Sequence, residues 1–214
     1  MNIIPVESGP LATMCYLAFD PQASTGIIID APMDSVDVFS SLAKKNEIKI
    51  QCLILTHSHW DHTADAYAIS QALDTPIFIH KDDEYRLLNP NEHSIMPLPF
   101  ELVATRADKY LNHKDTIKCG NITLEIRHTP GHTEGSVCIV SHDDKTVFTG
   151  DTLFMEGIGR VDLPGGSWGQ INESIESQLS TLADDYSVHC GHGPSTSIGH
   201  EKKYNPFISN NNTK

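Results

Sequence analysis

The chain has 214 residues, which suits one compact domain and leaves too little sequence for two full ones. Its composition, 39% hydrophobic and 20% charged, is typical of a protein with a buried core and excludes disordered, collagen-like and coiled-coil classes. The 28 Asp and Glu outnumber the 15 Lys and Arg, and the formal charge of −13 repels phosphate backbones, which argues against nucleic acid as a partner.

The opening part of the chain alternates short extended runs with turns. Runs rich in Ile and aromatic residues, bounded by Pro, Gly and Asp, predict strands over residues 2–6, 13–19 and 26–29. Apolar residues at helical spacing then predict a helix over residues 34–45, with Asp34 as its N-cap. A sheet with a first surface helix follows from this order.

The middle of the chain alternates predicted strands and helices. The apolar run 51–56 suits a strand buried on both faces, and a helix is expected over about residues 63–73. Residues 76–79 predict a short strand, residues 81–88 a short polar helix, and the Pro-punctuated stretch 89–99 a loop. This alternation is typical of an α/β protein.

The last part of the chain returns to the periodicity of strands from Thr116 onward. The predicted strands are residues 122–126, 136–140, 146–149 and 186–190. Between the last two, the segment 150–166 is rich in glycine, and Ser167 and Gln170 form a capping box for a helix that ends near residue 182.

Neither a targeting signal nor a membrane span is apparent in the sequence. No Lys or Arg precedes Lys44, and no apolar run approaches the roughly 18 residues of a membrane span. The five cysteines form no CxxC pair and are expected to be free thiols. We therefore expect a cytoplasmic protein without a membrane partner, with residues 1–208 as one domain and residues 209–214 as a polar tail. The oligomeric state is left open.

Histidine is the unusual residue of this sequence, with twelve in the chain. Directly after a predicted buried strand comes the segment HSHWDH (residues 57–62), which holds four potential metal ligands. Alternate residues of an extended chain point the same way, so His57 and His59 can address one metal, and Asp61 and His62 a second. A lone histidine is most often a core or surface residue, but four ligands at this spacing favour a metal site.

Three further candidate ligands each stand just beyond a predicted strand: His132, Asp151 and His192. Ligands at the ends of several strands meet at one rim of a sheet. Five imidazoles and two carboxylates without cysteine favour zinc, iron or manganese, and seven ligands are too many for one tetrahedral ion. The sequence therefore predicts two ions, which at a separation of about 3.5 to 4 Å share a water and lower its pKa.

Four motifs, in this order, resemble those of the metallo-β-lactamase fold: HSHWDH, GHT at 131–133, GD at 150–151 and GHG at 191–193. Within that fold the chain most resembles the glyoxalase II-like (hydroxyacylglutathione hydrolase-like) enzymes. That second resemblance lies in GDTLF (150–154), GRVDLPGG (159–166) and the ending GHGPSTSIGHEKKYNPF. Only a short segment follows His192, so the chain resembles the single-domain branch, which does not carry the helical glutathione-binding domain of the two-domain enzymes.

The resemblance implies an α/β (α+β) fold, a four-layer αββα sandwich with the metals at one edge. It implies that His57, His59 and His132 bind the first metal, that Asp61, His62 and His192 bind the second, and that Asp151 bridges them. The expected cofactors are two divalent ions, zinc first, with iron or manganese as alternatives. Asp61 is also expected to orient the attacking hydroxide.

The leading functional hypothesis is a metal-dependent hydrolase of a small-molecule thioester such as a hydroxyacylglutathione, in which a metal-bridging hydroxide attacks the carbonyl. A mononuclear-iron persulfide dioxygenase, with the equivalents of His57, His132 and Asp151 as ligands, is an alternative. A lactonase or β-lactam hydrolase on the same scaffold is another. A non-catalytic metal-binding module is disfavoured because all seven ligands are present.

Several residues outside the ligand set have alternative interpretations. Arg160 can hold a substrate carboxylate, or it can pair with Asp162 to fix its own loop, which is the favoured interpretation. Trp60 is expected to pack beneath the site. Among the remaining histidines, His128 and His189 are expected to support neighbouring ligands, because each lies close to one in sequence.

Overall fold

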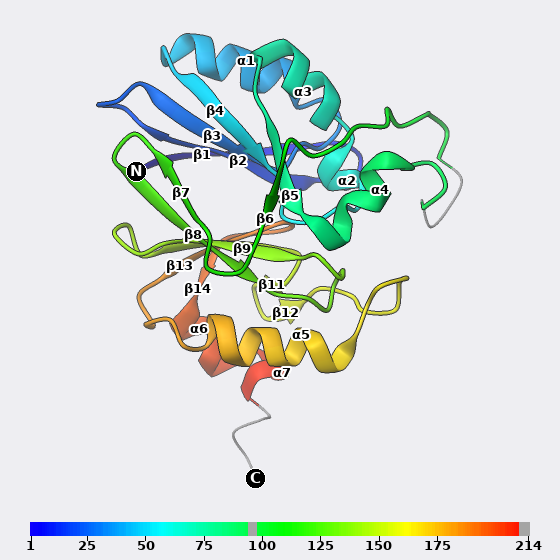
Figure 1. Cartoon of the computed structure of the whole chain (residues 1–214). Coiled ribbons are helices and arrows are strands. Elements are labelled where there is room, and N and C mark those ends of the chain that lie inside the picture. The colour runs from blue at the N-terminus through cyan, green and yellow to red at the C-terminus, as the bar shows by residue number, and fades with distance from the viewer. Residues whose placement is uncertain (94–97, 210–214) are drawn as a thin grey trace.

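Two β-sheets lie face to face in the middle of the molecule, and helices cover the outer side of each (Figure 1). The structure is a computed structural model that describes residues 1–93 and 98–209. Part of the predicted loop, residues 94–97, and residues 210–214 of the predicted tail lie outside the described residues. The proposed domain boundary after residue 208 falls in the last helix, α7 (Pro206–Ser209).

The first sheet contains six strands whose spatial order is their order in the chain. They are β1 (Asn2–Ser8), β2 (Thr13–Asp20), β3 (Thr25–Ile29), β4 (Lys49–Ile54), β5 (Ile77–His80) and β6 (Lys109–Leu111). β1, β2 and β3 pair antiparallel, and β3 to β6 pair parallel. The sequence predicted the first five of these strands to within two residues at each end, and it did not predict β6.

Helices on this side of the molecule follow β3, β4 and β5. They are α1 (Val36–Lys45), α2 (Trp60–Thr63), α3 (Ala66–Leu73), the 3₁₀-helix η1 (Lys81–Asp83) and α4 (Glu84–Leu88). The predicted start of the helix over about residues 63–73 was wrong, because α3 begins at Ala66 after a break that separates it from α2, but the predicted end at Leu73 is confirmed. The break leaves Asp65 as the N-cap residue of α3.

The predicted N-cap of α1 was also wrong. Ser35 occupies that position, while Asp34 lies just before it with a positive φ of 65°. The first turn of α1 is capped instead by a carboxylate distant in sequence, because the backbone N–H groups of Ser35 and Val36 donate to Asp65 Oδ2 at 2.9 and 3.1 Å. One aspartate thus joins the starts of α1 and α3.

The second sheet also contains six strands, in the order β14-β13-β10-β9-β8-β7. They are β7 (Thr116–Cys119), β8 (Ile122–His128), β9 (Val137–Ser141), β10 (Thr146–Gly150), β13 (Ser187–Cys190) and β14 (Thr196–Ser197). Only β10 and β13 pair parallel, and the short hairpin β11 (Leu153–Phe154) and β12 (Gly157–Ile158) stands apart. The four strands predicted over this region are confirmed.

The outer face of the second sheet is covered by α5 (Trp168–Ser174), the π-helix η2 (Ile175–Leu179), α6 (Ile198–Tyr204) and α7. The predicted cap of α5 is half confirmed. Ser167 Oγ accepts from the N–H of Gln170, but the N–H of Ser167 donates to the carbonyl of Gly131 at 2.8 Å rather than to Gln170. This bond fixes the start of α5 to the loop that carries His132.

Three apolar layers hold the elements together. Between the sheets, residues such as Ile27 and Ile54 of the first sheet pack against Leu124 and Phe148 of the second. The outer layers lie under the helices on either side. This αββα sandwich is the predicted fold. No helix in residues 1–93 and 98–209 has the length and apolar character needed to cross a membrane.

Candidate metal centre

The candidate site lies where strands of both sheets end. His57 follows β4, and α2 then begins at Trp60, so the segment between them turns tightly while its side chains stay together. The burial of His57 and His62, which expose at most 1% of their surface, shows that this histidine-rich segment faces inward. The other candidates follow β8, β10 and β13, as expected from the sequence.

The structure brings all seven predicted ligands into one cluster. One ligand atom from each of His57, His59 and His132 lies within 4.8 Å of the others, and Asp61, His62 and His192 form a second such group. Asp151 lies between the two groups. Its carboxylate oxygens are 3.3 Å from His62 Nε2, 3.5 Å from His132 Nε2 and 3.6 Å from His192 Nε2.

Buried polar atoms at the centre of the cluster indicate whether these residues could bind a metal ion. His57 Nε2, His132 Nε2 and Asp151 Oδ1 are buried and have no hydrogen-bond partner. A buried polar atom without a partner is costly, and three such atoms facing one point are what a ligand set requires. The residues therefore fit divalent metal ions with nitrogen and oxygen ligands.

The first group of histidines is suited to donating lone pairs. Burial lowers the pKa of His57 well below its ordinary value, and the neighbouring imidazoles lower it further. Burial and the charge of His132 lower the pKa of His59 to about 3. Both imidazoles are therefore neutral at pH 7, which is the form that binds metal.

The second group carries opposite charges. Burial raises the pKa of the Asp151 carboxyl group, but His62 and other histidines outweigh burial and hold it below its ordinary value. Burial lowers the pKa of His62, yet Asp151, Asp61 and Asp30 raise it well above its ordinary value. The carboxylates thus favour positive charge at this point, which a protonated His62 or a metal ion can supply.

Hydrogen bonds behind the ligands fix their orientation. Asp30 Oδ2 lies 2.8 Å from His62 Nδ1, Thr56 Oγ1 lies 3.1 Å from His57 Nδ1, and the Arg160 carbonyl accepts from His132 Nδ1 at 2.8 Å. Each of these imidazoles therefore turns Nε2 toward the cluster. Sequence reasoning missed both Asp30 and Thr56. Asp30 directly follows the predicted strand over residues 26–29, which is the same signal that identified the ligands, whereas Thr56 is the last residue of the predicted strand 51–56.

Asp83 is a second residue that sequence reasoning missed. Its side chain is fully buried, and its Oδ2 accepts from the N–H and Oγ of Ser58, both at 2.8 Å, and from Thr133 Oγ1 at 2.9 Å. Its Oδ1 accepts from the N–H of Gly135 at 2.6 Å. Since Ser58 stands between two candidate ligands and Thr133 follows a third, this carboxylate joins the two ligand loops.

Two glycines permit close approach around the cluster. A Cβ on Gly191 would lie 2.1 Å from Asp151 Oδ1, and a Cβ on Gly131, whose φ is +133°, would lie 2.2 Å from the backbone nitrogen of Ile171. Neither position accommodates a side chain without displacing its neighbour. The ligand Asp151 and the helix α5 therefore occupy space that these glycines leave free.

The family of this chain follows from a comparison of its sequence with known protein families. The sequence profile of the metallo-beta-lactamase superfamily matches residues 8–192. The chain belongs to the metallo-β-lactamase superfamily. Its cluster of histidines and aspartates is therefore one capable of binding metal ions within a metallohydrolase fold.

Two similar proteins match nearly the whole chain. The hydroxyacylglutathione hydrolase GloC of Haemophilus influenzae is 32% identical, with 98% of each chain covered. An uncharacterized protein of Mycobacterium tuberculosis is 36% identical over 97% of this chain and 98% of its own.

Two solved structures are also similar to this chain. The BLEG-1 B3 metallo-β-lactamase, 29% identical, superposes with a TM-score of 0.88 over 97% of this chain and 100% of its own. The protein TTHA1623 in a di-iron-bound form, 28% identical, has a TM-score of 0.79 over 95% of this chain and 99% of its own.

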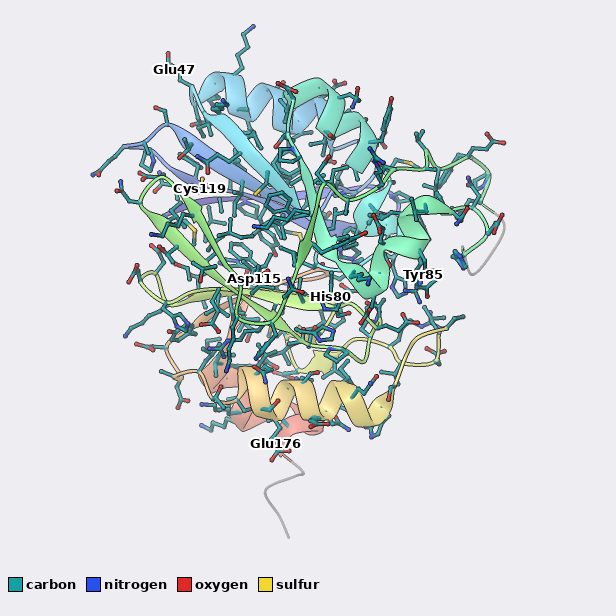
Figure 2. The ribbon with its side chains drawn as sticks, viewed as in Figure 1. Glu47, His80, Tyr85, Asp115, Cys119 and Glu176 are labelled. Atoms are coloured by element: carbon teal, nitrogen blue, oxygen red, sulfur yellow. The ribbon has the colours of Figure 1, made fainter. Side chains whose placement is uncertain are left out.

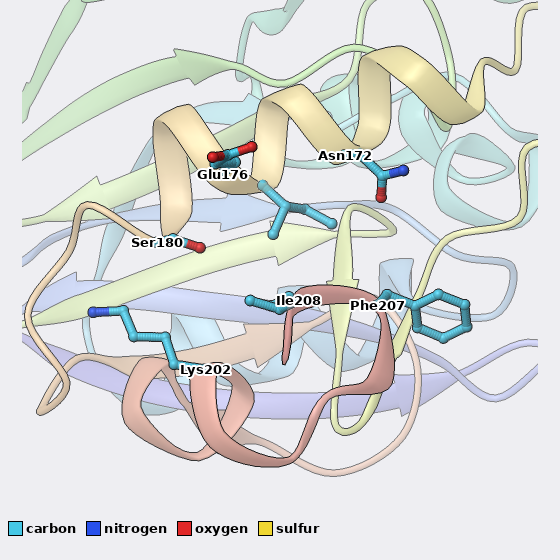
Figure 3. A pocket seen from close by; sticks show the side chains of 7 residues that line it. Asn172, Glu176, Ser180, Lys202, Phe207 and Ile208 are labelled. Atoms are coloured by element: carbon cyan, nitrogen blue, oxygen red, sulfur yellow. The ribbon is translucent and has the colours of Figure 1, made fainter. Parts of the chain in front are cut away.

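A cleft of about 310 Å³ opens beside the cluster, and His59 forms part of its wall. Its other lining residues are Tyr85, Arg86, Glu92, His93, Leu163 and Pro164. The Pro164 carbonyl accepts from Arg86 Nη2 at 2.7 Å, so the loop that carries Arg160 is fixed to α4 across this cleft. A second pocket, of about 280 Å³, lies between α5 and η2 on one side and α6 and α7 on the other (Figure 3), and it includes none of the candidate ligands.

Several predictions about residues outside the ligand set are settled by their contacts. The side chain of Arg160 pairs with Asp162 through two bonds of 2.8 Å, as favoured from the sequence. The supporting roles expected for His128 and His189 are wrong. His128 Nε2 contacts the Glu134 carbonyl and His189 Nδ1 contacts Ser195 Oγ, and neither reaches a candidate ligand.

Proposed function

We propose that this protein is a metal-dependent hydrolase of small thioesters such as hydroxyacylglutathione, of the single-domain glyoxalase II-like type. The observation that carries the proposal is the cluster of seven ligands beside a cleft of which His59 forms a wall. The 32% identity to GloC over nearly the whole of both chains supports a thioester substrate.

In this proposal two divalent ions, with zinc first and iron or manganese as alternatives, occupy the cluster. The ligands are His57, His59 and His132 for one ion, Asp61, His62 and His192 for the other, and Asp151 for both. When bound, such ions supply a Lewis acid and a water of lowered pKa. The similarity to TTHA1623 in its di-iron-bound form supports iron as an alternative to zinc.

The side chains around the cluster would position the nucleophile. Thr13 Oγ1 donates to Asp61 Oδ2 at 3.1 Å, and the same oxygen lies 3.2 Å from His192 Nε2. Held in this way, the Asp61 carboxylate accepts a hydrogen bond from the attacking water and orients it. A thiolate is a good leaving group near neutral pH, so the reaction needs no strong general acid from the chain.

The cleft would hold the thiol portion of the substrate. His59, Tyr85 and Arg86 line it from the metal cluster outward to α4. Contact between Arg160 and a substrate carboxylate also stays a proposal, and it requires Arg160 to release Asp162. The formal charge of −13 supports a small-molecule substrate over nucleic acid. The five free, buried cysteines suit a reducing compartment, and we propose the cytoplasm.

The deciding experiment is hydrolysis of S-D-lactoylglutathione by purified protein of known metal content. We expect turnover that a chelator abolishes and that about two ions per chain restore. Asp151→Ala should lose metal and activity together, because its carboxylate lies between both groups of ligands. A variant that retained both metals and full activity would contradict the two-metal proposal.

A second candidate activity is β-lactam hydrolysis, which the similarity to BLEG-1 favours. It uses the same cluster and differs in what the cleft accepts. If the metal-loaded protein hydrolyses a cephalosporin but not the thioester, this second candidate replaces the first. If it hydrolyses neither and takes up oxygen with glutathione persulfide, one bound iron per chain would identify a persulfide dioxygenase.

A further inference from the structure

The cleft beside the metal cluster holds more negative than positive charge. Its described lining residues include one arginine, Arg86, and one glutamate, Glu92, but no lysine. Two further carboxylates, those of Asp83 and Glu134, contact Arg86. Three carboxylates therefore share one guanidinium group around this cleft. Figure 2 shows Tyr85, another lining residue, on α4.

The charge of Arg86 is already compensated within the protein. Its Nη1 lies 2.9 Å from Glu134 Oε2 and 3.5 Å from Asp83 Oδ1, and its Nη2 donates to the Pro164 carbonyl at 2.7 Å. The side chain of Arg86 is only 6% exposed. A substrate carboxylate that approached Arg86 would also meet the field of its two carboxylate partners, so this arginine is poorly suited to binding an anion.

Glu92 is the charge of the cleft that no partner compensates. Its side chain is exposed, and among the residues that the structure describes no lysine, arginine or histidine forms an ion pair with it. Arg160 stands in the same loop as the lining residue Pro164, but it is paired with Asp162 and does not line the cleft. The uncompensated charge that faces the substrate is therefore negative.

Aromatic rings complete the wall beside Glu92. The rings of Tyr85 and His93 meet edge to face, with centroids 4.8 Å apart. Burial raises the pKa of Tyr85 to about 12, so its phenol is neutral at pH 7, and it donates to Glu134 Oε1 at 3.2 Å. An ammonium group is attracted both to a carboxylate and to the face of an aromatic ring, so this wall favours a cation.

We propose that the cleft binds thiol portions that carry an ammonium group, with Glu92 as the counter-charge, and disfavours thiol portions that end in a carboxylate. The inference rests on the proposed thioesterase function and names the preferred class of its substrate. Glutathione carries both kinds of group. Its thioester is therefore still hydrolysed, but less well than a thioester whose thiol portion is only cationic.

The test uses three D-lactoyl thioesters whose thiol portions differ in charge. The thiols are thiocholine, which is cationic, N-acetylcysteamine, which is neutral, and 3-mercaptopropionate, which is anionic. Each hydrolysis consumes one water, breaks the C–S bond and releases lactate and one thiol, so the released thiol measures all three reactions. The metal-loaded protein is assayed at pH 8, above the ordinary pKa of a histidine side chain.

We expect kcat/KM to be higher for the cationic than for the anionic thioester. Glu92→Gln should lower this ratio about 2- to 5-fold, the usual effect of one exposed ion pair. The attraction between an anion and the metal centre is the same in both proteins, so the change in the ratio reports the contribution of Glu92. Added salt should lower the wild-type ratio as well, because it screens exposed charges.

Glu47→Gln is the matched control, because it removes the same charge from an exposed glutamate. Glu47 follows α1 and lies far from Tyr85 and the cleft (Figure 2). A ratio that falls in Glu92→Gln and stays at the wild-type value in Glu47→Gln supports the inference. A wild-type ratio of one or less, or equal ratios in the two variants, overturns it and leaves the thioesterase function standing. If the metal-loaded protein hydrolyses none of the three thioesters, the proposed function fails and this inference fails with it.

Discussion

Asp83 joins the two loops that carry candidate metal ligands. Three donors converge on its Oδ2, from Ser58 and Thr133, and Gly135 donates to Oδ1, all without exposure to water. Arg86 lies against the same carboxylate at 3.5 Å. The side-chain amide of an asparagine at position 83 would point its N–H group at one of these donors. The resulting repulsion between two donors would weaken the connection between the two ligand loops.

We therefore expect Asp83→Asn to weaken metal binding about 10- to 100-fold, the usual cost of losing a group that supports metal ligands. It should also lower the free energy of unfolding by about 3 kcal/mol, because buried charge and donors lose their partner. Metal content after dialysis against a chelator and thermal unfolding measure the two effects. Asp162→Asn is the control, since it removes an exposed Asp–Arg pair; equal behaviour of the two variants would contradict the role of Asp83.

Arg160 contributes to the site through its backbone rather than its side chain. Its carbonyl accepts from His132 Nδ1, whereas its guanidinium group is exposed and paired with Asp162. Arg160→Ala keeps the carbonyl, so we expect metal content and unfolding temperature at wild-type levels. A KM raised for a substrate with a carboxylate and unchanged for an ester without one would assign the side chain to substrate binding. Loss of metal in this variant would show that the side chain itself supports the site.

At the scale of elements, the turns that follow the strands leave the space that the candidate ligands occupy. A Cβ on Gly191, in the turn after β13, would lie 2.1 Å from Asp151 Oδ1 and 2.7 Å from His62 Cε1. We expect Gly191→Ala to displace Asp151 and to release metal, as measured by metal content. Gly169→Ala in α5 is the matched control: nothing lies within 4 Å of its Cβ position, so it should retain metal and gain about 0.4 to 1 kcal/mol in stability. Full metal content in Gly191→Ala would contradict this account.

The sequence predicted elements with strong local signals and missed those that tertiary contacts define. The runs that became β2, β3 and β9 are continuous and apolar, and their positions were predicted closely. β6 (Lys109–Leu111) has only three residues and exists because it pairs with β5. The cap of α1 depends on Asp65, about 30 residues away, so no local pattern could reveal it.

The same distinction holds for the site. All seven candidate ligands stand in short motifs after strands, and the structure brings all of them together. Asp83 carries no such motif, because its partners Ser58 and Thr133 come from two loops that only the packed sheets bring near each other. Local sequence therefore predicts the ligands better than it predicts the residues that orient them.

At the scale of the whole molecule, the cluster joins the two halves of the sandwich. Four of its ligands come from the first sheet's side, through the segment 57–62, and three from loops of the second. The apolar layer between the sheets lies beside this junction. Metal ions held in common by both halves would oppose any separation of the sheets, so metal removal should loosen the layer between them.

The five buried cysteines allow this expectation to be measured layer by layer. Cys15 lies under α1, Cys52 and Cys119 lie between the sheets, and Cys138 and Cys190 lie under α5 and α6. Burial raises the pKa of Cys138 to about 11 and that of Cys52 to about 12, so none of these thiols should react quickly in the folded protein.

We expect slow labelling of all five thiols in the metal-loaded protein and full labelling after unfolding. Chelation should accelerate the labelling of Cys52 and Cys119 most. These two thiols lie in the apolar layer between the sheets, and the proposed ions would join the two sheets that enclose it. Mass spectrometry of peptides after timed exposure to a thiol reagent assigns each rate. If Cys15 accelerates as much as the two thiols between the sheets, the molecule opens as one unit and the ions do not specifically hold the sheets together.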